Sequence, residues 1–253
     1  MFYAGGTAGV RSSPVTEFEP YSTSHQIVAA ILVVGSGLLA WHGRARRGTA
    51  GVEVFCRGFA VAIVVVTVPL QVLTIVRAES DVAASLPLQL CDVASFVAPY
   101  ALWTRRAWAT ALAYFWGLTL TSQALITPDL SRDFPDPGFL LFWAMHVLVF
   151  WAAVYLVWGL GLVPTWQTYR SSVVITAGWA VAAGAFNASF GTNYGYLSHK
   201  PGSSSILDLF GPWPWYNLVQ VVILLVGWAL ITWPWVNAGA IRPRAATRLR
   251  GNV

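Results

Sequence analysis

The sequence predicts an all-α polytopic membrane protein, built as a bundle of seven transmembrane helices. Of its 253 residues, 57% are hydrophobic and only 10% are charged, whereas about 25% of the residues of an ordinary soluble domain are charged. A soluble domain of this length needs more charge to cover its surface. The 14 tryptophans agree with a membrane location, because indole rings concentrate where lipid headgroups meet hydrocarbon.

A helix needs about 20 mostly apolar residues to cross the hydrocarbon core of a bilayer. On this basis we expect spans at residues 25–42, 54–76, 82–103, 108–127, 138–162, 170–190 and 213–236. The first is short, and reaches full length only if polar residues beside it continue the helix. The start of the chain lacks the apolar core of a cleavable signal peptide, so the first span should act as the insertion signal. We expect three regions: an extracytoplasmic segment 1–24, a transmembrane domain 25–236 and a basic cytoplasmic tail 237–253.

The basic residues predict an outside N-terminus and an inside C-terminus, because Lys and Arg gather on the cytoplasmic side of membrane proteins. This orientation leaves four basic residues outside, which are Arg11, Arg77, Arg132 and Lys200. It places eleven inside, which are Arg44, Arg46, Arg47, Arg57, Arg105, Arg106, Arg170, Arg242, Arg244, Arg248 and Arg250. The net charge of +5 therefore reports orientation and not a nucleic-acid partner. Arginine outnumbers lysine 14 to 1, a bias typical of GC-rich bacterial genomes, so we expect a multi-pass protein of a bacterial plasma membrane.

Several polar residues are expected at one depth, in the outer half of the bundle. At 1.5 Å per helical residue, Cys91 lies roughly 14 Å into the third span and His146 roughly 12 Å into the fifth. Gln71, Gln123 and Asn187 of three other spans reach the same level. Each also has a plain structural interpretation, since a cysteine packs as a small apolar residue and polar side chains hydrogen-bond neighbouring helices.

Asp92 is harder to explain as a purely structural residue. A charged side chain at mid-span costs about 2.5–3.5 kcal/mol on insertion scales, so the carboxylate should face the bundle interior or a wet cavity. On a continuous helix, Ser85, Gln89 and Asp92 form one polar stripe with Cys91 at its edge. Pro87 should kink this helix or make it begin again, which would open a path from the outer leaflet to the thiol.

The segments LPLQLCDV and GTNYGYLSHKPGSSSILDLFGPWPWYN, with a lone His146 in an aromatic-rich span, resemble the bacterial YwaF-like integral membrane proteins. These proteins are relatives of the eukaryotic transmembrane-protein-164 phospholipid acyltransferases. The resemblance extends roughly from the second span to the last and implies a seven-helix bundle. It also implies transfer of a fatty acyl chain between phospholipids, with Cys91 as the nucleophile and His146 as its base. The sequence departs from these relatives at Gln89, where they often carry histidine.

Acyl transfer would give the polar residues distinct roles. A thiol in apolar surroundings needs a base within hydrogen-bonding reach, and Asp92 could orient or stabilise the imidazole of His146. Attack on a phospholipid ester would leave an acyl-thioester on Cys91, and a lysophospholipid hydroxyl would then take the chain. Contacts to the oxyanion or the phosphate are expected from polar residues near the thiol and in the outer loop, which are Gln89, Gln123, Asn187, Asn193, Tyr194, Tyr196, His199 and Lys200. We expect no cofactor and no metal ion.

Two other classes remain open. The polar layer could bind a solute in a small transporter or channel, with Asp92 as a proton or cation site. Against this class, the sequence has no convincing internal repeat, and the polar residues do not continue to the inner side. A seven-helix sensor or a structural membrane protein is favoured only by the number of spans. The loop around Lys200 also has a simpler interpretation as an aromatic anchor at the membrane surface.

Overall fold

The computed structural model describes residues 17–77, 85–128, 130–202 and 205–241. Seven long helices make up most of this part of the chain: α1 (Thr23–Arg46), α2 (Gly51–Arg77), α4 (Leu90–Thr104), α5 (Ala107–Ile126), α6 (Pro137–Val154), α7 (Trp166–Phe190) and α8 (Trp215–Ile241). A π-helical turn, η1 (Tyr155–Gly159), continues α6, and two short 3-10 helices, η2 (Tyr194–Tyr196) and η3 (Ile206–Phe210), lie between α7 and α8. No strand occurs in the described residues, where Glu17 and Arg132 form an isolated bridge. The predicted all-α class is confirmed.

Five of the described helices are long and apolar enough to cross a membrane: α1, α2, α6 with η1, α7 and α8. The protein is therefore a helical membrane protein. The long helices coincide with the seven segments that the sequence predicts as spans, and α1 continues to Arg46, so flanking polar residues do lengthen the first one. The number of seven spans and the orientation stay predictions, since α4 has only 15 residues, fewer than the roughly 17–25 that a span needs.

The third predicted span is not one continuous helix. Residues 86–89 are not helical, and α4 begins only at Leu90. Pro87 accounts for the break, because proline lacks the N–H that a helix requires and clashes with the preceding turn. The restart that the sequence predicts is thus confirmed. The predicted polar stripe of Ser85, Gln89 and Asp92 is wrong, because it needs a continuous helix through residues 86–89. The depth of Cys91 in the membrane stays a prediction.

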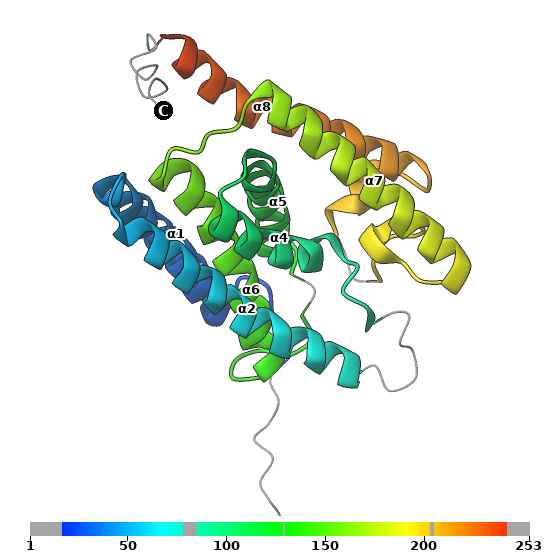
Figure 1. Ribbon diagram of the computed structural model, residues 1–253. Helices are drawn as coiled ribbons and strands as arrows, with labels where there is room; N and C mark the ends of the chain where they lie inside the picture. Colours follow the sequence, from blue (N-terminus) through cyan, green and yellow to red (C-terminus); the bar gives the residue numbers. More distant parts are fainter. Residues whose placement is uncertain (1–16, 78–84, 129, 203–204, 242–253) are drawn as a thin grey trace, which may run out of the picture.

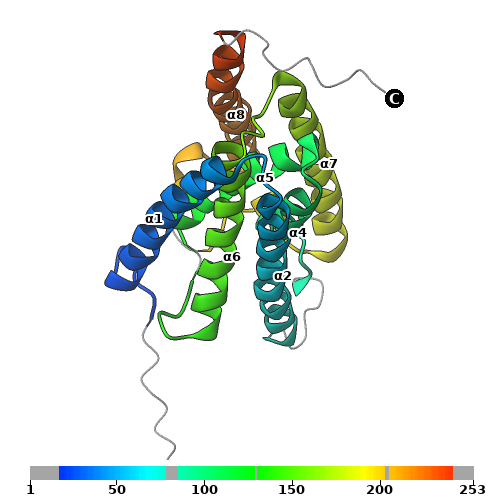
Figure 2. The ribbon, with the colours of Figure 1, turned by 60° about the vertical axis from the view of Figure 1, so that its left-hand side comes forward.

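The helices form a middle group and two outer pairs. Helices α4, α5 and α6 lie in the middle, with α1 and α2 on one side and α7 and α8 on the other (Figure 1). Helices α1, α6 and α8 run toward the same end of the bundle, whereas α2 and α7 run away from it (Figure 2).

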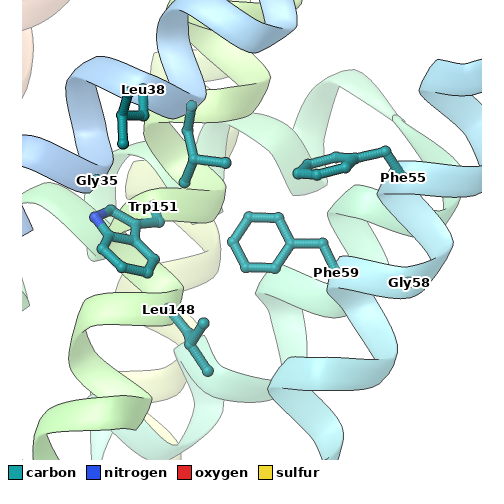
Figure 3. Close-up of a pocket in the computed structure, with 8 residues that line it drawn as sticks. Gly35, Leu38, Phe55, Gly58, Phe59, Leu148 and Trp151 are labelled. Atoms are coloured by element: carbon teal, nitrogen blue, oxygen red, sulfur yellow. The ribbon is translucent and has the colours of Figure 1, made fainter.

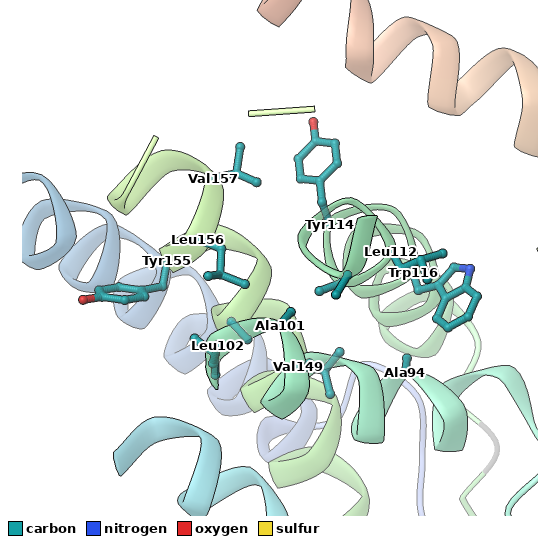
Figure 4. Close-up of a cluster of buried hydrophobic side chains, with 14 of the residues drawn as sticks. Ala94, Ala101, Leu102, Leu112, Tyr114, Trp116, Val149, Tyr155, Leu156 and Val157 are labelled. Atoms are coloured by element: carbon teal, nitrogen blue, oxygen red, sulfur yellow. The ribbon is translucent and has the colours of Figure 1, made fainter. Parts of the chain in front are cut away.

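The buried core lies among the middle helices (Figure 4). On α5, Phe115 and Trp116 are almost fully buried, and the ring of Phe115 stacks on Trp228 of α8 with centroids 4.7 Å apart. In contrast, side chains such as Val33 of α1 and Val181 of α7 are about 70% exposed. Apolar side chains directed outward are expected of helices whose surroundings are lipid.

One end of the bundle is basic. Arg44 and Arg47, at the end of α1, donate hydrogen bonds to carbonyl groups of η1. Arg105, which follows α4, lies 3.7 Å from the carboxylate of Glu53 at the start of α2. Arginines that the sequence assigns to one side of the membrane therefore do meet at one end. Of the basic residues used to predict the orientation, five lie outside the described residues, which are Arg11, Arg242, Arg244, Arg248 and Arg250. Most of segment 1–24 and of the tail also lie outside them.

Candidate functional site

Cys91 is partly buried and is the second residue of α4. The first hydrogen bond of this helix runs from the Val93 N–H to the Gln89 carbonyl, at 3.1 Å, and the N–H groups before it point out of the helix end. The thiol therefore lies in the open first turn of α4, beside Asp92.

Asp92 lies in the same first turn and contributes to its structure. Its carboxylate accepts a hydrogen bond of 2.9 Å from the side-chain amide of Gln71 on α2, and another from the backbone N–H of Gln89. The second contact is half of a capping box, in which the third helical residue satisfies the N–H of the residue before the helix. Asp92 thus caps α4 and ties its start to α2.

His146 lies on α6 and is held by its own helix. Its Nδ1 is 2.8 Å from the carbonyl oxygen of Phe142. A carbonyl oxygen only accepts, so Nδ1 carries the proton and Nε2 is left as the proton acceptor of a neutral imidazole. We expected Asp92 to orient this ring. In the structure the Phe142 carbonyl orients it, and the Asp92 carboxylate is bonded to Gln71 instead.

The side chains of Cys91 and His146 line one small cavity between α4, α5 and α6. Its other lining residues are Ala94, Thr121, Met145 and Val149, of which Figure 4 shows Ala94 on α4 and Val149 on α6. The Thr121 hydroxyl donates a hydrogen bond of 3.2 Å to the His146 carbonyl, which fixes α5 against α6 at this level. The cavity has a volume of about 10 Å³, roughly the space of one water molecule. A lipid chain enters only when the lining side chains move.

Gln89 joins the start of α4 to the loop that follows α7. Its Oε1 accepts a hydrogen bond of 2.9 Å from the Gly195 N–H in η2, and the neighbouring Leu88 carbonyl accepts one of 3.1 Å from the Trp179 indole on α7. Gly195 has a φ of 67°, and a Cβ there would lie 2.5 Å from the Trp179 ring. Only glycine fits this position. The non-helical residues ahead of Cys91 are therefore fixed by contacts with α7 and η2.

Two of the predicted substrate-binding residues organise this loop. The buried Asn187 side chain donates a hydrogen bond to the Tyr194 carbonyl and accepts from the Tyr194 N–H and the Thr192 hydroxyl, at 2.8–3.0 Å. The amide of Asn193 donates to the His199 carbonyl at 2.7 Å. These bonds satisfy the amide groups within the loop, away from the cysteine cavity.

The remaining predicted contacts are also engaged elsewhere. At Tyr196 the backbone carbonyl accepts a hydrogen bond of 2.6 Å from the Tyr216 hydroxyl, which ties the loop to α8 and does not involve the Tyr196 side chain. The Lys200 ammonium lies 3.6 Å from the Asp208 carboxylate and 5.9 Å from the centre of the Tyr216 ring. Gln123 is exposed on α5 and does not belong to the described residues that line the cavity. Of all predicted site residues, the cavity collects only the thiol and the imidazole.

Sequence reasoning missed three contributors to this site. Thr121 lies two residues before Gln123, and therefore on the opposite face of α5. The Phe142 carbonyl lies one helical turn before His146. A hydrogen bond from the imidazole to this carbonyl can be predicted from the four-residue spacing alone. Trp179 had no signal, because the sequence does not show that α7 approaches Leu88. Among the described residues, no three His, Cys, Asp or Glu side chains are placed to hold a metal ion.

Comparison with known proteins assigns the family. No curated protein and no solved structure matches the chain. The sequence model of one protein family, the TMEM164 family, matches residues 20–232. The match begins before α1, ends within α8, and includes both Cys91 and His146. Because it covers well over half of the sequence, this membrane protein belongs to the TMEM164 family.

Proposed function

We propose that this protein is an intramembrane acyltransferase that moves a fatty acyl chain from a phospholipid to a lysophospholipid. One observation carries the proposal: Cys91 and His146, from different helices, line the same cavity. The proton on Nδ1 of His146 leaves Nε2 as a base for the thiol. Membership of the TMEM164 family supports this function, since the sequence resembles phospholipid acyltransferases of that family.

The reaction would pass through a thioester. Nε2 of His146 takes the thiol proton while the Cys91 sulfur bonds to the carbonyl carbon of the phospholipid ester. The electron pair of the carbonyl moves to its oxygen, where the N–H groups at the start of α4 stabilise the oxyanion. The ester C–O bond then breaks, and the departing glycerol oxygen takes the proton from Nε2. A lysophospholipid hydroxyl reverses these steps, accepts the acyl chain and restores the thiol.

Substrate binding requires the cavity to open, since it now holds about one water molecule. The non-helical residues 86–89 lie just ahead of the first turn of α4, which carries Cys91, and we expect the opening movement there. Trp179 and Gly195 hold these residues through one hydrogen bond each. Met145 is the most adaptable lining side chain, because its unbranched thioether changes rotamer easily.

The test uses purified protein in phospholipid nanodiscs with a phospholipid labelled in its acyl chain and a lysophospholipid acceptor. Wild type should transfer the label and carry an acyl-thioester on Cys91, detected by intact-protein mass spectrometry and released by hydroxylamine. Cys91→Ala should abolish both signals, and His146→Ala should remove most of each. Cys56→Ala is the matched control, because Cys56 is buried in the core away from the cavity, and it should keep transfer.

Full transfer by Cys91→Ala, or equal loss in both cysteine variants, would refute the proposal. Thermal unfolding in detergent checks that each variant folds. If no variant transfers acyl chains but solute uptake into liposomes survives Cys91→Ala, the protein is a transporter instead.

A further inference from the structure

A second, larger cavity lies on a different face of α6. It is a groove of about 480 Å³ between α1, α2 and α6 (Figure 3). Its lining residues are all apolar: Gly35, Leu38 and Leu39 of α1, Phe55, Gly58 and Phe59 of α2, and Leu148 and Trp151 of α6. Leu148 is two residues from His146, so it points away from the cysteine cavity. The groove is therefore separate from the proposed acyl-transfer site.

Trp151 and two glycines keep this groove open and dry. Gly35 is in contact with Trp151, because a Cβ there would lie 2.0 Å from the indole ring. The Trp151 N–H is already bonded to the Leu32 carbonyl at 3.0 Å, so the indole turns only apolar surface to the groove. At Gly58, which is exposed, a Cβ would meet no atom within 4 Å. The groove thus opens outward here, and apolar cavities without polar partners do not hold water.

Arg46 places positive charge at one end of the groove. It lies two helical turns beyond Leu39 on the same face of α1, about 10 Å along the axis. Its guanidinium would be 3.7 Å from a Cβ built on Gly51, at the start of α2, and Gly51 lies two turns before Gly58. Arg44 and Arg47 add charge at the same end. An arginine therefore stands between the ends of the two helices that border the groove.

The spacing between charge and groove matches a phospholipid in one leaflet. Each leaflet contributes about 15 Å of hydrocarbon, so a groove about 10 Å from the arginines lies at the depth of the acyl chains. Basic residues at this level attract anionic headgroups. The apolar lining of the groove thus complements the acyl chain of an anionic lipid, and the arginines at its end complement the headgroup.

We propose that this groove binds one acyl chain of an anionic phospholipid and that Arg46 attracts the net negative charge of its headgroup. The bound lipid is a ligand of the bundle and not the acyl donor, because the groove and the Cys91–His146 cavity lie on different faces of α6. The proposal is independent of acyl transfer and stands if that function is refuted.

Photo-crosslinking of the full chain in phosphatidylcholine nanodiscs tests the groove. The probes are a phosphatidylglycerol and a phosphatidylcholine, each with a diazirine in one acyl chain, and labelled peptides are mapped by mass spectrometry. The anionic probe should label the α1 and α2 peptides that contain Leu38 and Phe55 in preference to α7 and α8. Gly58→Leu fills the opening and should remove most of this label. Gly37→Leu is the matched control, since Gly37 also has free space around its Cβ but faces away from Gly35, and it should keep the label.

Arg46→Gln tests the headgroup contact. It should lower labelling by phosphatidylglycerol about fivefold, which corresponds to the ~1 kcal/mol of one basic residue near an anionic lipid, and leave labelling by phosphatidylcholine unchanged. Arg170→Gln, an exposed arginine at the start of α7, is the control without effect. Should Gly58→Leu fail to fold, Leu38→Trp fills the groove from α1. Equal labelling by the two probes, equal labelling of α7 and α8, or full labelling of the filled variants would overturn the proposal.

Discussion

The Asp92 carboxylate makes contacts that hold the helices together, whereas the sequence suggests that it has a catalytic role. The amide of Gln71 and the backbone N–H of Gln89 both donate to it, and its position in the first turn compensates the positive end of α4. These bonds offset the cost of a carboxylate inside the bundle. The orienting role expected of an acid at His146 belongs to the Phe142 carbonyl, which fixes the tautomer without adding a charge.

Asp92→Ala should therefore lower stability more than chemistry. It leaves two donors without their partner, which costs about 1–3 kcal/mol when such groups are buried. Asp92→Asn, which keeps an acceptor oxygen, should cost less. Thermal unfolding in detergent measures the effect, and Gln71→Ala combined with Asp92→Ala should destabilise by less than the sum of the single changes. Unchanged Tm together with a loss of acyl transfer as large as that of His146→Ala would instead make Asp92 a catalytic residue.

Gln89 offers a second test at the scale of one residue. Because its Oε1 accepts the Gly195 N–H, Gln89→His can preserve the contact through a ring nitrogen, whereas Gln89→Leu cannot. We expect Gln89→His to keep Tm and acyl transfer. Gln89→Leu should lower Tm, because losing one hydrogen bond to the half-buried Gly195 N–H costs about 1 kcal/mol. Equal behaviour of the two variants in thermal unfolding would argue against a role for this bond.

At the scale of elements, the site depends on where α4 begins, which is Leu90 and not the start of the predicted span at residue 82. The break at Pro87 places the first turn of α4, and with it Cys91, opposite His146. Local sequence features predict this break and the positions of the seven long helices, because apolar runs and a proline act within one segment. The start at Leu90 rests on contacts with Trp179 and Gly195 from distant segments, and no local pattern reveals those.

A comparison of alanine substitutions at Gly195 and Gly191 distinguishes the cost of backbone strain from the cost of a clash with Trp179. Both have positive φ, 67° and 70°, but only at Gly195 would a Cβ meet the Trp179 ring, whereas at Gly191 it meets nothing within 4 Å. Gly191→Ala should cost about 1–2 kcal/mol, the penalty of the left-handed conformation. Gly195→Ala should cost more and should also slow acyl transfer, because displacing Trp179 loosens its bond to Leu88. Denaturant unfolding in detergent compares the pair. Identical losses would show that Trp179 adapts freely.

At the scale of the whole molecule, the sequence predicts which segments are helices but not which helices are neighbours. All seven are apolar, so periodicity does not distinguish a lipid-facing side from a protein-facing one. The middle position of α4, α5 and α6 depends on fitted shapes, such as the close approach of Gly117 on α5 to α6, where a Cβ would lie 3.2 Å from Ala153 and from the Val149 carbonyl oxygen. The pairing of Cys91 with His146 depends on that arrangement. The sequence pointed to it in two ways, through the similar depth of the two residues in their predicted spans and through the resemblance to known proteins.

The topology prediction belongs to this largest scale. Arginines at the end of α1, the start of α2 and the end of α4 meet at one end of the bundle, and basic ends of membrane proteins face the cytoplasm. A reporter fused after Val253 should therefore be active only on the cytoplasmic side, and a tag inserted at Ser22 should be accessible from outside in intact cells. Replacing Arg44, Arg46 and Arg47 by glutamine should reduce the proportion of correctly oriented molecules, while the same change at Arg132 should not. If the tag at Ser22 reacts only after permeabilisation, the bundle lies the other way round, and both the cysteine cavity and the lipid groove open to the opposite leaflets.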